Sequence, residues 1–316
     1  SSHRVSEILD ETPAQQVPET PLSPNLKGGV AFENVSFSYA GAGKESLHEI
    51  SFCARSGETI GIIGPTGSGK STLVNLVPRF YDASSGTVCI DGQDVTQIDE
   101  KILRTAVAVV PQKALLFTGT ILENLRWGRE DASLEEVRCV AKIACADSFV
   151  SEMENGYDTL LSQGGVNLSG GQKRRVAIAG VLAMKPEVLI LDEPTAGLDP
   201  AGRDEILDLV ARMHRERNMT VILVSHSMED VAKYVERIIV MNHGQVMFDD
   251  TPKEVFRHYK ELETIGLAAP QVTYLMHELK EHGLSVDTEA TTVEEARASL
   301  MQALTGIDSG RSDIHR

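Results

Sequence analysis

No stretch of the sequence is apolar for long enough to cross a bilayer as a helix, which takes about 18 or more consecutive apolar residues. The apolar runs, such as Val188–Leu191 and Val221–Val224, have the length of strands. We therefore expect no membrane-spanning segment in this chain.

Basic residues are fewer than acidic ones: the chain has 30 Lys and Arg against 46 Asp and Glu, which gives a formal net charge of −16. A protein whose main partner is nucleic acid is expected to carry a basic face. The charge balance therefore argues against a nucleic-acid partner. The chain has only four cysteines and no CxxC pair, which favours free thiols in a reducing compartment.

The length of 316 residues allows one large α/β domain with an appendage, or two domains. Residues 1–28 predict a helical stub and a proline-broken linker, because Val5, Ile8 and Leu9 lie at helical spacing before a series of prolines. The main domain is expected at 29–250, with a helical subdomain at about 119–175. Residues 251–316 are helix-rich, with Glu and Lys at short intervals, and predict a small C-terminal helical region.

Strand patterns alternate with helix patterns along the main domain. Glu187–Asp192 and Met219–Ser225 are β-branched and nearly uncharged, which is typical of buried parallel strands. Near residue 30 the alternation of apolar residues changes parity at Glu33-Asn34, which indicates a bulge or a turn within a strand that pairs with Leu47–Ala54. The alternation predicts an α/β fold with a mainly parallel sheet covered on both faces.

A glycine-rich segment between a predicted strand (Glu58–Ile63) and a predicted helix (Lys70–Pro78) matches G-x-x-x-x-G-K-S/T. Glycines let the backbone curl so that its N–H groups face phosphate oxygens, and the helix N-terminus adds positive potential. The strand–loop–helix context favours a nucleotide site over a loop without a ligand. The predicted ATP-binding residues are Gly64, Pro65, Thr66, Gly67, Ser68, Gly69, Lys70, Ser71 and Thr72.

The residues around this loop predict the chemistry. Lys70 is expected to reach the β- and γ-phosphates, and Ser71 to ligate Mg²⁺. Asp192 ends a strand of four apolar residues, where it can hold the same Mg²⁺. Glu193 follows and is placed to orient and deprotonate the attacking water. The alternative for the acidic pair is a solvated turn after a core strand.

Leu168-Ser169-Gly170-Gly171-Gln172 resembles the LSGGQ signature of ABC transporter ATP-binding domains. Ser169 is placed to cap a helix, while Gly170 and Gly171 leave N–H groups exposed. The resemblance implies a P-loop NTPase fold of the ABC type, with an antiparallel β subdomain and a helical subdomain. It also implies that Ser169, Gly170, Gly171 and Gln172 face ATP bound by a second ATPase subunit in a head-to-tail dimer.

Four further positions match elements of that family. Tyr39 resembles the aromatic residue that stacks on adenine, and Gln112 resembles the glutamine that contacts Mg²⁺ and water. Asp199 resembles the loop aspartate that crosses the dimer interface, and His226 resembles the histidine that touches the γ-phosphate. The respective alternatives are a core aromatic residue, a loop amide, a helix-capping turn and a structural histidine.

The two halves resemble different subfamilies. Leu116–Leu125 and Gly156–Thr159 are similar to ABC exporters, whereas Arg174–Met184 and Glu193–Pro200 are similar to ATPase subunits of energy-coupling factor (ECF) importers. The tail also resembles the region through which ECF ATPases pair. A hybrid chain joined within about residues 164–175, engineered or computed, is one explanation. A natural ATPase with mixed features is the other.

The predicted function is an ATP-hydrolysing subunit, with catalytic residues Lys70, Gln112, Glu193 and His226, that powers a transmembrane transporter subunit on another chain. Such a subunit is expected at the cytoplasmic face of the membrane, or free in the cytoplasm when expressed alone. The alternatives are a hybrid domain that binds or hydrolyses ATP without transport, and a non-transport ABC ATPase. The second is disfavoured because the sequence has one cassette and no basic surface.

Overall fold

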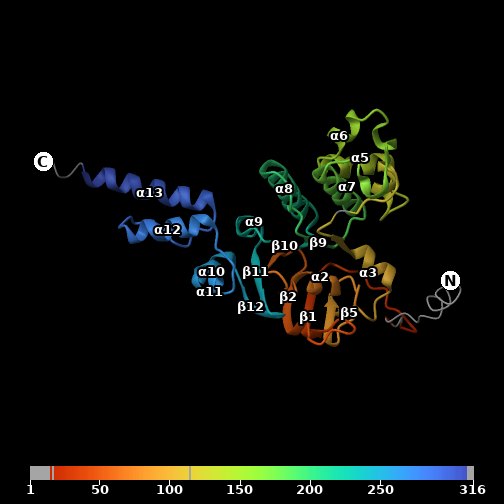
Figure 1. Cartoon of the computed structure of the whole chain (residues 1–316), viewed down its shortest axis with the longest axis horizontal. Helices are drawn as coiled ribbons and strands as arrows, with labels where there is room; N and C mark the ends of the chain where they lie inside the picture. Colours follow the sequence, from red (N-terminus) through yellow and green to blue (C-terminus); the bar gives the residue numbers. More distant parts are fainter. Residues whose placement is uncertain (1–14, 16–17, 114, 312–316) are drawn as a thin grey trace.

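The computed structural model describes residues 15, 18–113 and 115–311. The predicted N-terminal helical stub lies outside the described residues. The structure has two sheets, a helical lobe next to the larger sheet, and a C-terminal arm of helices that extends from the opposite end (Figure 1).

The larger sheet has six strands in the order β12-β11-β3-β10-β9-β6, and every neighbouring pair is parallel except β11 with β12. Residues that alternate along one strand belong to different cores: Leu189 and Leu191 pack in one cluster, and Val188 and Ile190 in another. The sheet is therefore covered on both faces, which is why its central strands are mostly apolar. The strands are β3 (Thr59–Ile63), β6 (Val107–Val110), β9 (Val188–Asp192), β10 (Thr220–Val224), β11 (Arg237–Asn242) and β12 (Gln245–Asp250).

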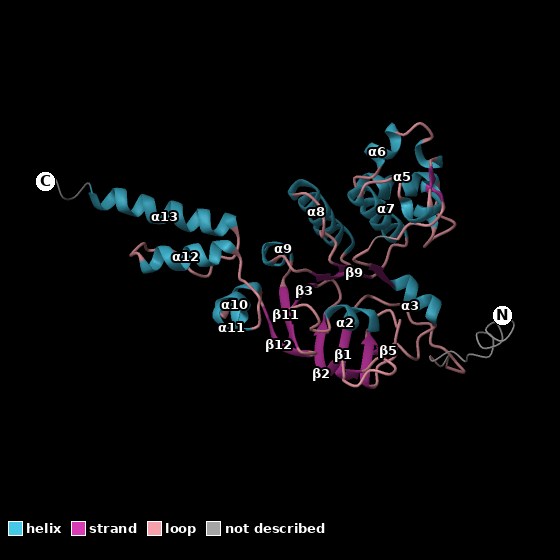
Figure 2. Ribbon diagram, viewed as in Figure 1, coloured by secondary structure: helices cyan, strands magenta, loops and turns pink. Residues whose placement is uncertain are grey.

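The second sheet is antiparallel, in the order β2-β1-β4-β5. Its register shifts between Phe32 and Val35, and Asn34 has a left-handed φ of 50°, so the predicted irregularity at Glu33-Asn34 is confirmed. Figure 2 shows helix α2 (Lys70–Leu76) next to the strands of this sheet. Buried side chains of the sheet and of α2 belong to one core. The strands are β1 (Val30–Phe37), β2 (Leu47–Ala54), β4 (Ser85–Ile90) and β5 (Gln93–Asp94).

The helical lobe packs its helices on α7 (Gly170–Ala183), which also contacts β6 of the main sheet. Three of its helices begin with a capping box. The hydroxyl of the first Ser or Thr accepts a hydrogen bond from a backbone N–H three residues later, and the Glu or Gln side chain at that later position accepts one from the backbone N–H of the Ser or Thr. The capping residues are Thr120, Ser133 and Ser169. The lobe contains β7 (Gly119–Thr120), α4 (Ile121–Arg126), α5 (Leu134–Ile143), α6 (Asp147–Glu152) and β8 (Leu160–Leu161).

The remaining helices surround the main sheet or form the arm. Helices α3 (Glu100–Ala106), α8 (Pro200–Arg217) and α9 (Met228–Tyr234) lie between strands of the main sheet in the chain. The arm has its own small core around Met276 and Val286. None of the helices in the described ranges is both long and apolar enough for a bilayer span. The arm helices are α10 (Pro252–Arg257), α11 (Tyr259–Thr264), α12 (Gln271–Glu281) and α13 (Val293–Arg311).

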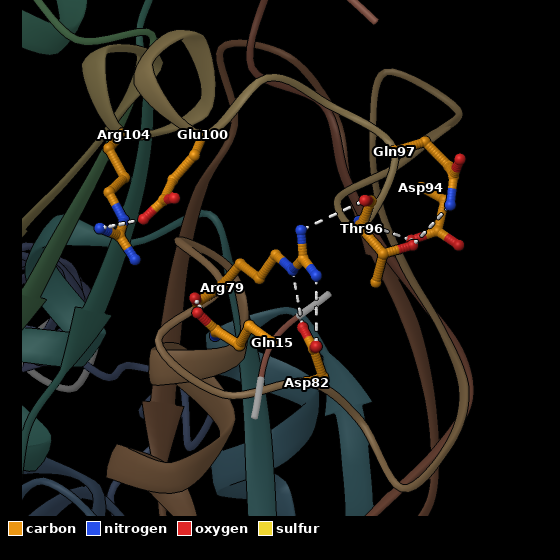
Figure 3. A network of polar contacts seen from close by, with 8 residues as sticks. All are labelled: Gln15, Arg79, Asp82, Asp94, Thr96, Gln97, Glu100 and Arg104. Atoms are coloured by element: carbon orange, nitrogen blue, oxygen red, sulfur yellow. Dashed lines mark hydrogen bonds and ion pairs between the residues drawn. The ribbon is translucent and has the colours of Figure 1, made fainter. Parts of the chain in front are cut away.

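A polar network fixes the end of α2, the helix that follows the glycine-rich loop. Arg79 is buried and donates from Nε and Nη2 to the two carboxylate oxygens of Asp82, at 2.7 and 3.2 Å. Its Nη1 donates to the carbonyl of Thr96, which follows β5 (Figure 3). The bidentate ion pair with Asp82 fixes the guanidinium, and the bond to the Thr96 carbonyl connects the end of the helix to the antiparallel sheet. The predicted fold class is confirmed.

Candidate functional site

The glycine-rich loop connects the end of β3 to the start of α2, as the sequence predicts. Lys70, the first residue of α2, is buried, and its Nζ donates to the carbonyls of Gly64 and Pro65 at 2.8 and 3.0 Å. Burial lowers the pKa of Lys70, and the nearby carboxylates of Glu193 and Asp192 oppose that shift. The loop therefore curls around the ammonium group that is predicted to meet phosphate.

Two features of this loop follow from its close packing. Gly69 has φ 100°, and a Cβ there would lie 2.9 Å from the Ser46 carbonyl oxygen and 2.8 Å from Leu47 Cδ2, so only glycine fits. The hydroxyl oxygen of Ser68 is buried and has no hydrogen-bond partner among the described residues. A buried polar atom without a partner is costly, but this hydroxyl lies beside Gly64, where a built Cβ would approach it to 2.6 Å, and Ser68 is not among the residues that line the cavity described below.

Ser71 and Asp192 lie near each other beside the loop. The Ser71 hydroxyl favours the charged form of the Asp192 carboxylate, which lies at the carboxyl end of β9. Burial raises the pKa of Asp192, and the charge of Glu193 adds to the rise, whereas Ser71 and Lys70 counteract it. A hydroxyl and a carboxylate are the hard oxygen ligands that Mg²⁺ prefers, so the pair fits that ion.

Glu193 lies at the centre of a hydrogen-bonded cluster. Gln112 donates from Nε2 to Glu193 Oε2 at 2.8 Å, and His226 Nε2 lies 2.8 Å from Glu193 Oε1. The three residues come from the ends of β6, β9 and β10, which are neighbours in the parallel sheet. Parallel strands bring their carboxyl ends to one edge, and residues far apart in the sequence meet there. The cluster can hold a carboxylate in a fixed orientation next to the loop.

A cavity of about 910 Å³ contains the loop and this cluster. Nine of the predicted site residues line it: Thr66, Gly67, Gly69, Lys70, Ser71, Thr72, Gln112, Glu193 and His226. Five lining residues escaped the sequence prediction: Lys44, Glu45, Ser46, His243 and Gly244. Of these, His243-Gly244 carried a signal in the sequence, because an X-Gly pair between two apolar runs is typical of a hairpin turn. The turn joins β11 to β12, and the Gly244 carbonyl accepts a bond from the backbone N–H of His48 at 2.8 Å.

Tyr39 lies beside the cavity but is not among its lining residues in the described part of the chain. Its hydroxyl is 3.1 Å from the hydroxyl of Thr72, and its ring meets Phe37 and Tyr81 edge to face, with centroids 4.8 and 5.3 Å away. The ring is 37% exposed. The position is compatible with an adenine platform, which stays a prediction.

The predicted signature residues are at a different place. Ser169 caps α7, with its hydroxyl accepting from the Gln172 N–H at 3.2 Å, and Gln172 Oε1 accepting from the Ser169 N–H at 2.9 Å. Asp199 precedes α8 and makes no capping bond from its side chain. Within the described residues, neither Ser169–Gln172 nor Asp199 lines the cavity. The glycine-rich loop and the signature therefore do not form one site within a single chain.

Comparisons with known proteins agree with these motifs. The family model described as ABC transporter matches residues 47–196. The energy-coupling factor transporter ATP-binding protein EcfA2 of Clostridium tetani is 45% identical over 263 residues, which are 82% of this chain and 90% of that protein. The protein of the same name from Acetivibrio thermocellus is 44% identical, over 81% of this chain and 91% of that protein.

A solved structure described as a bacterial Atm1-family ABC exporter with ATP bound is also similar, with a TM-score of 0.76 and 34% identity. The match covers 81% of this chain but only 45% of the exporter chain. An alignment of 263 residues in a chain of 316 necessarily crosses residues 164–175, so one relative matches both sides of the predicted join. The comparisons thus give no support to a hybrid chain. With 45% identity to a protein that it covers almost completely, this chain belongs to the ABC transporter family as an ATP-binding, ATP-hydrolysing subunit similar to the energy-coupling factor ATPases.

Proposed function

We propose that the cavity next to the glycine-rich loop is the ATP site and that Glu193 is the general base of hydrolysis. The observation that carries this proposal is the cluster in which Gln112 and His226 each lie 2.8 Å from one carboxylate oxygen of Glu193. A carboxylate held from both sides cannot swing freely, and fixed orientation is the main way in which enzymes accelerate phosphoryl transfer to water.

Lys70 has the charge and the position to bind the β- and γ-phosphates of ATP. Its present acceptors are two carbonyl oxygens of its own loop, and phosphate oxygens are stronger acceptors for an ammonium group. The backbone N–H groups of the loop add further donors. Mg²⁺, held by Ser71 and Asp192 with Gln112 nearby, would neutralise charge on the transferred phosphoryl group.

A complete site requires a second ATPase subunit. Ser169–Gly171 presents a capped helix N-terminus at which Gly170 is exposed and Gly171 half-buried, and such a terminus attracts phosphate. This surface does not reach the cavity of its own chain. In a head-to-tail dimer each chain would close its signature over the ATP of the other, and Asp199 would lie at the interface. We also propose that the C-terminal region at 251–316 contributes to pairing.

The relatives named as transporter ATP-binding proteins support a transmembrane partner on another chain. The segment after Gln112 offers a surface for it, because Phe117 and Trp127 stack at 4.1 Å between ring centroids and remain 48% and 67% exposed. Exposed aromatic pairs of this kind are typical of protein interfaces. A chain that works in this way acts at the cytoplasmic face of the membrane.

Active-site complementation tests the proposal. Lys70→Met removes the loop side of a site and Ser169→Arg blocks the signature side, so each variant alone should be inactive. When the two are co-expressed, half of the dimers are mixed and each has one intact site, so roughly a quarter of the wild-type ATPase activity should return.

A pair from the same side provides the control. Lys70→Met with Glu193→Gln leaves every mixed dimer with two damaged sites and should recover no activity. A wild-type chain that hydrolyses ATP while the Lys70→Met and Ser169→Arg pair stays inactive would contradict a sandwich made by two copies of this chain. A wild-type chain without ATPase activity would contradict the proposed site itself.

A further inference from the structure

Arg174 connects two segments that the catalytic cluster depends on. It lies on α7, five residues after Ser169, and only 7% of the residue is exposed. Its Nη1 donates to the carbonyl of Ala196 at 2.5 Å, and its Nη2 donates to the carbonyl of Gln112 at 2.7 Å. The planar fork of a guanidinium can make both bonds at once, whereas the single ammonium of lysine cannot match that geometry.

The two residues whose carbonyls accept from Arg174, Gln112 and Ala196, also form hydrogen bonds with Glu193. The Gln112 side chain donates to the Glu193 carboxylate at 2.8 Å, and the Ala196 N–H donates to the Glu193 carbonyl at 3.2 Å. The contacts therefore close a ring that runs from Arg174 through Gln112 and Glu193 to Ala196 and back. A shift of the guanidinium would be passed to Glu193 from two directions.

The surroundings of Arg174 destabilise its charged form. Among the described residues it has hydrogen bonds to carbonyls and no carboxylate partner, and its Nε is buried without an acceptor. Burial lowers the pKa of Arg174, and the charge of Glu193 partly opposes that shift. Replacing buried charges with apolar groups is often neutral or stabilising. Stability alone thus gives a weak reason for an arginine here, which points to a role in the site.

We propose that Arg174 is a positioning residue for ATP hydrolysis: it fixes the backbone of Gln112 and the turn after Glu193, so that the carboxylate keeps its orientation toward the water. Because Arg174 lies on the helix that begins at the signature, it also joins a chain's own catalytic cluster to the surface offered to the partner's ATP. The inference rests on the proposed function of Glu193.

Arg174→Lys keeps the charge and removes the fork, and Arg174→Gln removes the charge as a second variant. Both should lower kcat on the order of 10- to 100-fold, because small misplacements of catalytic groups have effects of that size. The KM for ATP should stay within about twofold, because Arg174 does not line the cavity. Arg175→Lys is the matched control, since Arg175 is the next residue and forms a more exposed ion pair with Glu205 at 2.7 Å.

A double-mutant cycle separates positioning from general loosening. In a Gln112→Ala background the route through the Gln112 side chain is already broken and only the route through Ala196 remains, so Arg174→Lys should cost several-fold less in kcat than it does in the wild-type background. Equal losses in both backgrounds, or a kcat of Arg174→Lys equal to that of Arg175→Lys, would overturn the inference.

Hydrogen exchange gives a readout that does not depend on turnover. Arg174→Lys should speed exchange in 111–118 and in 194–199 but not in the loop 64–69. If the wild-type chain lacked ATPase activity and the exchange still changed, the proposed function would fail while the structural link held. Unchanged exchange in both segments would remove the link.

Discussion

Replacing Glu193 by glutamine changes one oxygen to an NH₂ group and leaves the size of the side chain the same. The new amide oxygen can still face His226. Its nitrogen, however, would face the donor Nε2 of Gln112, now 2.8 Å from Glu193 Oε2. Gln112 can turn its amide over so that its oxygen accepts, since both groups of an amide are of similar size. The cluster should therefore keep its shape while losing the group that takes a proton from water.

The expected loss of turnover follows from the role of a general base, which contributes about 10²- to 10⁴-fold and so about 3–5 kcal/mol of transition-state stabilisation. ATP binding should persist, because Lys70 and the loop backbone are unchanged. Ser71 and Asp192, the proposed Mg²⁺ ligands, are unchanged as well. With binding intact and hydrolysis slow, ATP should hold two chains together.

Phosphate release at saturating ATP and Mg²⁺ measures the first effect, and molar mass in ATP measures the second. Glu205→Gln is the control, because its carboxylate is half exposed and pairs with Arg175 outside the cluster. It should leave turnover unchanged. A Glu193→Gln variant with wild-type turnover would refute the assignment of the base. A variant with slow turnover that stays monomeric in ATP would refute the trapped sandwich.

Two further substitutions test the loop and the metal pair. Gly69→Ala should abolish ATP binding and lower the melting temperature more than Gly67→Ala does. Both positions have positive φ, which costs about 1–2 kcal/mol for alanine, but only at Gly69 would the Cβ clash with Ser46 and Leu47. Asp192→Asn should abolish Mg²⁺-dependent turnover without lowering the melting temperature of the nucleotide-free protein at neutral pH. Burial raises the pKa of Asp192 above its ordinary value of 3.8. Ionisation of this group therefore destabilises the wild-type fold as the pH rises from 3.8 through the raised pKa. The melting temperature should fall less across that pH range in Asp192→Asn than in the wild type.

Local patterns were enough to predict the glycine-rich loop, the strand that ends at Asp192 and the capped helix at Ser169, because each depends on residues close together in the sequence. Arg174 shows what such patterns miss. It stands between Lys173 and Arg175, and three consecutive basic residues are typical of a solvated helix face. Only the packing of α7 against β6 and the turn at Ala196 buries the middle one. The cavity wall at Ser46 and His243 was missed for the same reason, since it is built from loops that meet only in the folded chain.

The backbone of Glu193 also gives a physical reason for the bonds around it. Glu193 has φ 50°, in the left-handed region that glutamate rarely adopts, and it precedes Pro194, which restricts it further. Such a conformation costs about 1–3 kcal/mol and persists only where the surroundings enforce it. The Glu193 N–H donates to the Val224 carbonyl at 2.9 Å, which holds one end, and Arg174 holds the turn at the other through Ala196. If the turn relaxed, the carboxylate would leave the edge of the sheet where Gln112 and His226 meet it. Buried Arg174 and strained Glu193 therefore depend on each other. The packing of α7 against the sheet stabilises a backbone conformation of Glu193 that is unfavourable by itself, and this conformation keeps the proposed base in place.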